Sequence, residues 1–210
     1  MIALWLILVG MVAFAAGAFV LGLWLRRHPS KENAERSSRV MHLLFFASLV
    51  GPALLGMFWP GLGKFDGLLG VAPLPARGLF VGLGVVLMMP GVYLLAVTNS
   101  RLRALGSGAN AFRLTKRIVE TDIYERTRNP MSLGFYLAAL GASLVSGSAT
   151  AMLGTLLGLI PAHLLFLKYF EEQELELRFG ESYRAYRANT PFLLPRLAGR
   201  HSDESTKEAR

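Results

Sequence analysis

The 210-residue sequence contains no cysteine, which excludes disulfides, thiolate metal sites and cysteine nucleophiles. Charge is also scarce: Asp, Glu, Lys and Arg make up only 17% of the residues, whereas 53% are hydrophobic. This composition is too apolar for an ordinary soluble domain. Several stretches reach the roughly 18 apolar residues that can cross a bilayer. The sequence therefore predicts an integral membrane protein.

Acidic residues are the minority charge, with 14 Asp and Glu against 22 Lys and Arg, and the net charge is +8. A basic chain can bind nucleic acid, but here the basic residues cluster beside apolar stretches. Membrane topology and anionic lipid explain that placement better, so we expect the lipid bilayer as partner and no nucleic acid. No group of His and carboxylate residues has metal-ligand spacing, and we expect no metal.

The apolar stretches predict an all-α integral membrane fold with five transmembrane helices. The expected spans cover residues 1–25, 40–59, 77–97, 131–145 and 149–170. Pro90 lies inside the third span and should kink it. A tight turn at 146–148 makes the last two spans a helical hairpin, and the Gly154–Gly158 pair offers a small-residue face for close helix packing.

Lys and Arg gather in three of the connecting segments. These segments follow the first, third and fifth spans, and the first of them, the polar segment 28–39, is predicted to be a loop. The loop at 60–76 and the turn at 146–148 are nearly uncharged. Because cytoplasmic loops carry the basic residues, the N-terminus is predicted outside and the three basic segments inside. An even number of spans would put one basic cluster on the wrong side.

The last span should continue as a helix to Phe179-Gly180, since glycine often ends helices, and a short cytoplasmic helix should follow. Glu174 and Arg178, four residues apart, are expected to form an ordinary surface pair. The domain organisation predicted is a three-span scaffold at 1–98, then a cofactor-binding loop, hairpin and cytoplasmic cap at 99–197. A disordered tail follows at 198–210.

One ordered set of motifs resembles a known family. In chain order these are Arg128-Asn129-Pro130, Gly134, Glu171-Glu172, Phe179-Gly180, Tyr183, Tyr186 and Pro195, with Gly106-Ser107-Gly108 upstream. The set resembles the integral-membrane methyltransferases that include isoprenylcysteine carboxyl methyltransferase and the phosphatidylethanolamine N-methyltransferases. The resemblance covers about residues 106–196. The sequence departs from the family pattern at Ser132, where Tyr is usual, and at Asp122, within a segment that is commonly Thr-Gly-Pro-Tyr.

This resemblance implies S-adenosyl-L-methionine as cofactor. Glu171 or Glu172 can hold its ammonium or ribose diol, and Arg128 can pair with its carboxylate. Tyr183 and Tyr186 can stack on adenine or cover the sulfonium. The remaining predicted cofactor residues are Asn129 and Pro130 of the first motif, with Gly106, Gly108 and Gly134 for close backbone approach.

Each of these residues also has an ordinary interpretation. A Glu pair at a span end is commonly a solvated helix, and Arg128 alone is more often a topology anchor. His163 lies deep in the fifth span, which makes it a functional candidate, although a neutral His bonded to a neighbouring helix is an equal alternative. The predicted catalytic residues are Arg128, Glu171 and His163. His42, near a membrane interface, is expected to be structural.

The leading functional prediction is S-adenosylmethionine-dependent methyl transfer. The acceptor would be a membrane lipid or small apolar compound, with a carboxylate, amine or thiol as nucleophile, reached from the bilayer. The site is expected on the cytoplasmic face of a bacterial inner membrane. The alternatives are an NADPH-dependent membrane reductase resembling sterol reductases and a non-catalytic lipid-binding member of the family.

Overall fold

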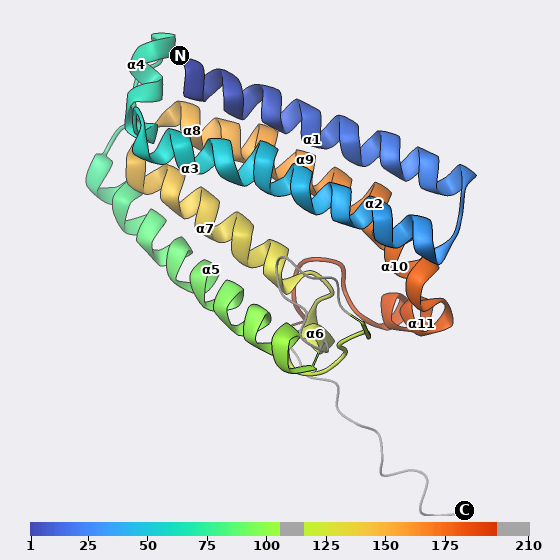
Figure 1. Ribbon diagram of the computed structural model, residues 1–210. Helices are drawn as coiled ribbons and strands as arrows, with labels where there is room; N and C mark the ends of the chain where they lie inside the picture. The colour runs from blue at the N-terminus through green and yellow to red at the C-terminus, as the bar shows by residue number, and fades with distance from the viewer. Residues whose placement is uncertain (106–115, 197–210) are drawn as a thin grey trace, which may run out of the picture.

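The computed structural model describes residues 1–105 and 116–196, and all regular structure in these two ranges is helical (Figure 1). Four helices are long and apolar enough to cross a membrane: Ile2–Arg27, Lys31–Phe58, Arg77–Leu105 and Ala149–Phe179. The helix expected as the fourth of five spans, α7 (Pro130–Ser146), is apolar but has only 17 residues. The described chain thus has four helices of spanning length and a shorter fifth.

Two of the long helices contain wider π-helical turns. The second, here called helix 31–58, consists of α2 (Lys31–Leu44), η1 (Phe45–Val50) and α3 (Gly51–Phe58). The last, here called helix 149–179, consists of α8 (Ala149–Gly154), η3 (Thr155–Leu159), α9 (Ile160–Phe166), η4 (Leu167–Glu171) and α10 (Glu172–Phe179). Such π-turns occur often at functional sites.

The prediction of a polar loop at 28–39 was wrong. Helix 31–58 begins at Lys31, because the Ser30 hydroxyl accepts a hydrogen bond from the Asn33 amide at 3.1 Å and caps its N-terminus. The Arg36–Glu32 ion pair lies on the exposed side of this charged first part. The third span, α5 (Arg77–Leu105), likewise continues past its expected end, and Pro90 lies within it.

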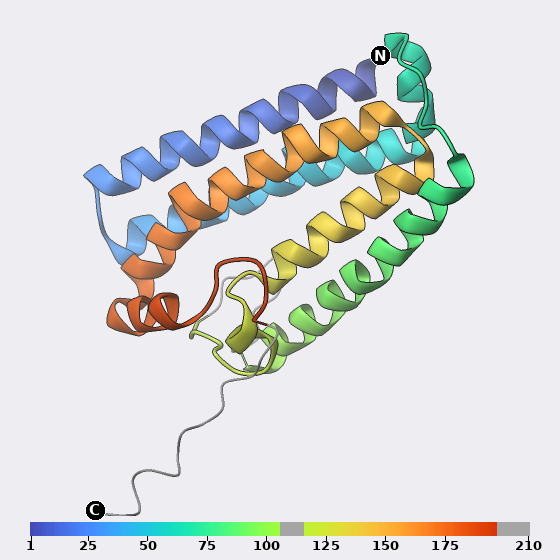
Figure 2. The same ribbon diagram turned by 180° about the vertical axis from the view of Figure 1, so that it is seen from behind.

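Two packed groups of helices make up the bundle. Helix 149–179 lies between α1 (Ile2–Arg27) and α7, and helix 31–58 runs alongside (Figures 1 and 2). The core is centred on Phe14 of α1, which is fully buried and packs against Phe45 and Phe166. The second group pairs α7 with α5, which lies at the edge of the bundle.

Glycines set the separation of α5 and α7. A Cβ at Gly84 would lie 2.6 Å from the Gly141 carbonyl oxygen, and one at Gly91 would lie 2.6 Å from the Ala138 nitrogen. The two backbones therefore touch where side chains are missing. The close packing expected at the Gly154–Gly158 pair does not occur in that form. A Cβ at Gly154 would meet nothing within 4 Å, and Gly158 faces the Met11 side chain.

One end of the bundle is tied by a buried carboxylate. The short helices η2 (Leu62–Lys64) and α4 (Phe65–Leu69) lie beside the N-terminus of α8. Asp66, 2% exposed, accepts hydrogen bonds from the Ser148 hydroxyl at 2.9 Å and from the Ala149 and Thr150 amides at 2.9 and 2.7 Å. A carboxylate is favourable there because the start of a helix presents unpaired N–H groups.

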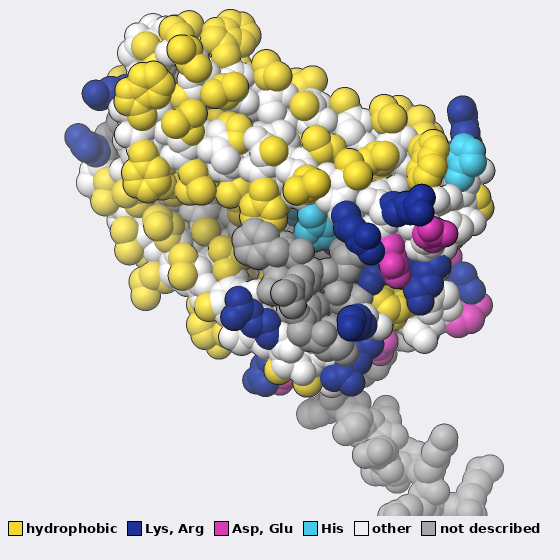
Figure 3. Space-filling model, viewed as in Figure 1, with side chains coloured by type: hydrophobic (Ala, Val, Ile, Leu, Met, Phe, Trp, Pro, Cys, Tyr) yellow, Lys and Arg dark blue, Asp and Glu magenta, His cyan; other side chains and the backbone are white. Residues whose placement is uncertain are grey.

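The other end carries the polar cap. Helix 149–179 ends at Phe179, Gly180 has a positive φ of 58°, and α11 (Glu181–Asn189) follows. The short α6 (Ile123–Arg126) lies near it, and the Tyr186 hydroxyl donates to the Tyr124 carbonyl at 2.8 Å. Charged side chains gather at this end, while hydrophobic side chains cover the flank of the bundle (Figure 3). That flank matches the surface of a protein embedded in lipid.

Candidate functional site

A cavity of about 440 Å³ lies where helix 31–58, α5, the start of α7 and helix 149–179 converge. At one end its walls carry polar groups, from Ser38, His42, Tyr124, Arg128, Asn129, Ser132, Glu171, Glu174 and Arg178. The other walls are mainly apolar and aromatic, from Met41, Phe45, Phe46, Val50, Leu95, Leu102, Phe135, His163, Phe166 and Leu167, among others. All three residues predicted as catalytic line this one cavity.

Arg128 is held at the cavity wall, with its side chain only 8% exposed. Its Nη1 lies 3.0 Å from Oε1 of Glu172, an ion pair whose angles fall short of a hydrogen bond. Its Nε has no hydrogen-bond partner among the described residues. A buried guanidinium with an unsatisfied N–H is suited to receive an anionic group.

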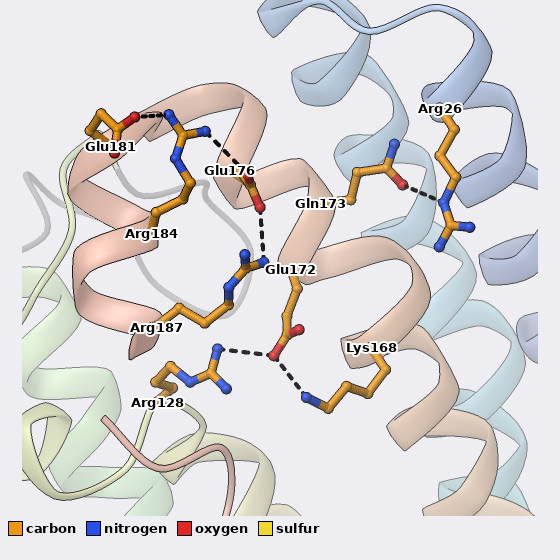
Figure 4. A network of polar contacts seen from close by, with 9 residues as sticks. All are labelled: Arg26, Arg128, Lys168, Glu172, Gln173, Glu176, Glu181, Arg184 and Arg187. Atoms are coloured by element: carbon orange, nitrogen blue, oxygen red, sulfur yellow. Dashed lines mark hydrogen bonds and ion pairs between the residues drawn. The ribbon is translucent and has the colours of Figure 1, made fainter. Parts of the chain in front are cut away.

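Glu172 does not line the cavity, and its carboxylate instead contacts two cationic side chains. Lys168 donates to the same Oε1 of Glu172 at 3.1 Å, so that this carboxylate is shared between Lys168 and Arg128 (Figure 4). The Lys168 ammonium also lies 3.8 Å from the centre of the Phe192 ring. Glu172 is therefore satisfied within the protein, and its geometry is that of a residue that positions Arg128.

Glu171, the neighbouring residue, lines the cavity at the last position of η4. No hydrogen bond or ion pair joins it to another residue in ranges 1–105 and 116–196. A carboxylate in such a place costs free energy unless a ligand satisfies it. This is the strongest indication of a cationic or hydroxyl-bearing ligand in the cavity.

Glu174 and Arg178 correct the expectation of a surface pair. Their side chains are 2% and 6% exposed, they are joined at 2.7 Å, and both line the cavity. The i,i+4 spacing was recognised from the sequence, but the burial was not, because α2 covers this face of α10. The pair adds two opposite charges to the polar end of the cavity.

His163 sits in an aromatic cage at the other end. Its Nδ1 lies 2.8 Å from the Tyr136 hydroxyl on α7, and its ring stacks on Phe14 with the centroids 6.0 Å apart. Phe45 and Phe135 lie within 6 Å of the same ring. The bond to a neighbouring helix is one of the two arrangements that the sequence left open, and the ring still reaches the cavity wall.

The loop before α7 is fastened by the C-terminal segment 191–196. The Arg128 amide donates to the Pro191 carbonyl at 2.9 Å, and the Asn129 side-chain amide donates to the Phe192 carbonyl at 2.9 Å. The buried Thr127 hydroxyl donates to the Leu193 carbonyl at 2.9 Å. Asn129 and Pro130 line the cavity, so this segment fixes the position of the first motif.

Five other predicted cofactor residues do not line the cavity or lie outside the described residues. Gly134 faces α5, where a Cβ would lie 2.9 Å from the Gly91 carbonyl oxygen. Tyr183 and Tyr186 are buried between α11 and its neighbours, and burial raises the pKa of both phenols, which therefore stay neutral. Gly106 and Gly108 lie outside the described residues.

Several cavity residues were not predicted as site residues. His42 was assigned a structural role, and Glu174 and Arg178 were expected only as an ordinary surface pair. The one sequence signal that could have found His42 is its spacing of four from Ser38, which puts both on one face of a helix once that helix is known to begin at Lys31.

Comparisons with known proteins cover part of the chain that forms this cavity. A family model described as phospholipid methyltransferase matches residues 79–182, which include Arg128 and both Glu171 and Glu172. The chain also resembles methanethiol S-methyltransferase 2 of Bradyrhizobium diazoefficiens, with 34% identity over 90 residues. That stretch is 42% of this chain and 32% of the relative, so the match spans about a third of the relative's length. No solved structure matches.

These matches, on an all-helical fold with four helices of spanning length, support an integral-membrane methyltransferase family. The match begins within α5 and ends within α11. Helix 31–58 lies outside it, although this helix supplies one wall of the cavity.

Proposed function

We propose that the protein transfers a methyl group from S-adenosylmethionine to a small apolar acceptor, and that the acceptor is a thiol. The observation that carries this proposal is that one cavity is lined both by Glu171, which has no hydrogen-bond or ion-pair partner among the described residues, and by the buried Arg128 guanidinium. The cavity, at about 440 Å³, is within the range of small-molecule sites.

The residues present fit the cofactor. The unsatisfied N–H of Arg128 suits its carboxylate, and Glu171 suits its ammonium or its ribose diol. When bound, S-adenosylmethionine supplies an electrophilic methyl group on a sulfonium. The chain's own contribution is to hold both ends of the ligand, to align the acceptor and to exclude water through the aromatic walls.

The acceptor class rests on two observations. The wall opposite the charged end is apolar, with Phe46, Val50 and Leu95 among its residues. The name of the matched relative, methanethiol S-methyltransferase 2, points to a small thiol. Because the cavity wall includes helix 31–58 and α5, whose outer faces carry exposed apolar residues, we propose entry from the bilayer.

The orientation follows from charge. The polar end of the cavity lies at the end of the bundle where Lys and Arg are concentrated, so we propose that it faces the cytoplasm, with the N-terminus outside. The membrane would be a bacterial inner membrane. A reporter fused at the N-terminus and one fused after residue 196 should report opposite sides.

Calorimetric binding to the detergent-purified protein tests the proposal, with NADPH titrated beside S-adenosylmethionine. We expect micromolar binding of S-adenosylmethionine alone. Glu171→Gln should weaken it by about tenfold to a hundredfold, the contribution of a hydrogen bond to a charged group. Glu172→Gln, one residue away, is the matched control and should weaken it less, because Glu172 contacts Arg128 and not the cavity.

Two results would overturn the proposal. Binding of NADPH in place of S-adenosylmethionine would indicate the reductase alternative. Binding of S-adenosylmethionine without turnover of any thiol, amine or carboxylate acceptor would indicate the non-catalytic alternative.

A further inference from the structure

His42 lines the cavity, and one of its ring nitrogens is hydrogen-bonded to the backbone. Its Nδ1 lies 2.8 Å from the backbone carbonyl oxygen of Ser38, one helical turn earlier. A carbonyl only accepts hydrogen bonds, so the neutral ring must carry its hydrogen on Nδ1 and a lone pair on Nε2. No partner of this second nitrogen is found among residues 1–105 and 116–196. In the neutral ring, this backbone contact leaves Nε2 as the nitrogen that can accept a proton.

Along helix 31–58, His42 lies between the residues that line the two ends of the cavity. Ser38, four residues earlier, lines the cavity on the α2 segment that packs on α10, which carries Glu174. Phe45, three residues later, packs on the His163 ring with centroids 5.2 Å apart. One helical turn is about 5.4 Å. His42 therefore lies between the charged end, where the cofactor would bind, and the aromatic end, where an apolar acceptor would bind.

We propose that His42 is the general base that removes the proton from the acceptor thiol. This inference rests on the proposed function. In the balanced step, the proton of the S–H group moves to Nε2 as the sulfur attacks the methyl carbon. A new S–CH₃ bond forms on the acceptor sulfur as the bond between the methyl carbon and the sulfonium sulfur breaks. The acceptor becomes a neutral methyl thioether, and S-adenosylhomocysteine is the leaving group. The imidazolium then returns its proton to water.

The charges around the ring suit this role. From helix 149–179 the cavity receives Glu171, Glu174 and Arg178, and from the loop before α7 it receives Arg128 and Tyr124. The residues that α5 contributes, Leu95 and Leu102, are apolar. Glu174 and Arg178 neutralise each other, as do Glu172 and Arg128. Glu171 is the remaining acidic residue that lines the cavity, and the proposed function assigns it to the cofactor.

The activity test compares His42→Gln with the wild type, using a small alkanethiol and measuring S-adenosylhomocysteine between pH 6 and 10. A thiol with a pKa of about 8.5 is only about 3% ionised at pH 7, so loss of the base should slow the reaction about 30-fold there, and more for a weaker acid. The variant's rate should then rise about tenfold per pH unit, as the thiolate does, until the difference from wild type disappears. His28→Gln is the control, since His28 lies outside the cavity and packs on Trp24.

A second readout does not depend on turnover. Nitrogen NMR of ¹⁵N-histidine-labelled protein, compared with His42→Gln, should assign to His42 a neutral ring with hydrogen on Nδ1. Addition of the thiol should shift only the Nε2 signal. A ring with its hydrogen on Nε2, or a variant whose rate is low by one factor at every pH, would overturn the inference.

Calorimetry separates this inference from the proposed function. Wild type and His42→Gln should bind S-adenosylmethionine equally, since His42 is assigned to the acceptor. If both bind it and both show the same pH profile, His42 is not the base and the proposed function stands. If the wild type binds none, the proposed function fails and the role of His42 fails with it.

Discussion

The close contact of α5 with α7 can be tested by two substitutions on one helix. Gly82 and Gly84 lie two residues apart in α5, but an added Cβ at Gly82 would meet nothing within 4 Å. At Gly84 it would lie 2.6 Å from the Gly141 carbonyl oxygen and 2.9 Å from the Val145 nitrogen. Both of these are backbone atoms, so no side chain can rotate out of the way, and one helix must move.

The expected effects have opposite signs. Gly82→Ala removes the conformational freedom of an exposed helical glycine and should stabilise the protein by about 0.5–1 kcal/mol. Gly84→Ala makes the same gain but overfills a close-packed interface, which costs about 1–3 kcal/mol. The stability of the two variants should therefore differ by about 1–3 kcal/mol, with Gly84→Ala the less stable.

Thermal unfolding in detergent, followed by tryptophan fluorescence, measures the difference. The two variants should bracket the wild type, with Gly84→Ala melting several degrees below Gly82→Ala. Equal melting temperatures would refute the close contact. The outcome also concerns the site, because α5 supplies Leu95 and Leu102 to the cavity and α7 supplies Met131 and Ser132.

Three further outcomes follow from the described contacts. Burial raises the pKa of Asp66, but its hydrogen bonds at the start of α8 outweigh burial and hold the pKa below its ordinary value. Its contribution to stability is therefore present above about pH 4 and lost as the pH falls through the lower folded pKa, and Asp66→Asn should remove that part of the acid dependence in melts between pH 6 and 2. Asn129→Ala removes the donor to the Phe192 carbonyl and should make the segment after residue 190 more sensitive to limited proteolysis, with a loss of about 1 kcal/mol in stability. Ser132→Tyr fills part of the cavity with a ring and should raise KM for bulky thiols more than for methanethiol, whereas equal changes for both would place Ser132 away from the acceptor.

The fold was predictable where the signal is local. Length and apolar composition identified the long helices, and Gly180 marked the end of helix 149–179. The segment 28–39 was misjudged because polarity was given more weight than the cap at Ser30. A polar helix is stabilised when a partner covers part of it, and that partner, α10, is about 140 residues away in the sequence.

Long-range packing also explains the errors at the glycines. The spacing of Gly154 and Gly158 is the same kind of pattern as that of Gly84 and Gly91, and only the three-dimensional pairing of α5 with α7 decides which set is used. The order of the motifs, by contrast, grouped Arg128 with Glu171, and both residues line one cavity. A family pattern reflects contacts between distant segments, which the residue spacing within a single helix does not reveal. His42 belongs to no motif, and its role depends on which helices surround it.

The division of work between Glu171 and Glu172 follows from helix geometry. Neighbouring residues of a helix point about 100° apart, so the two carboxylates face different surroundings. Glu172 faces Lys168 and Arg128 and is neutralised by them. Glu171 faces the cavity without a partner among the described residues. The sequence shows two equivalent acids, but in the structure one of them pairs with Arg128 and the other lines the cavity.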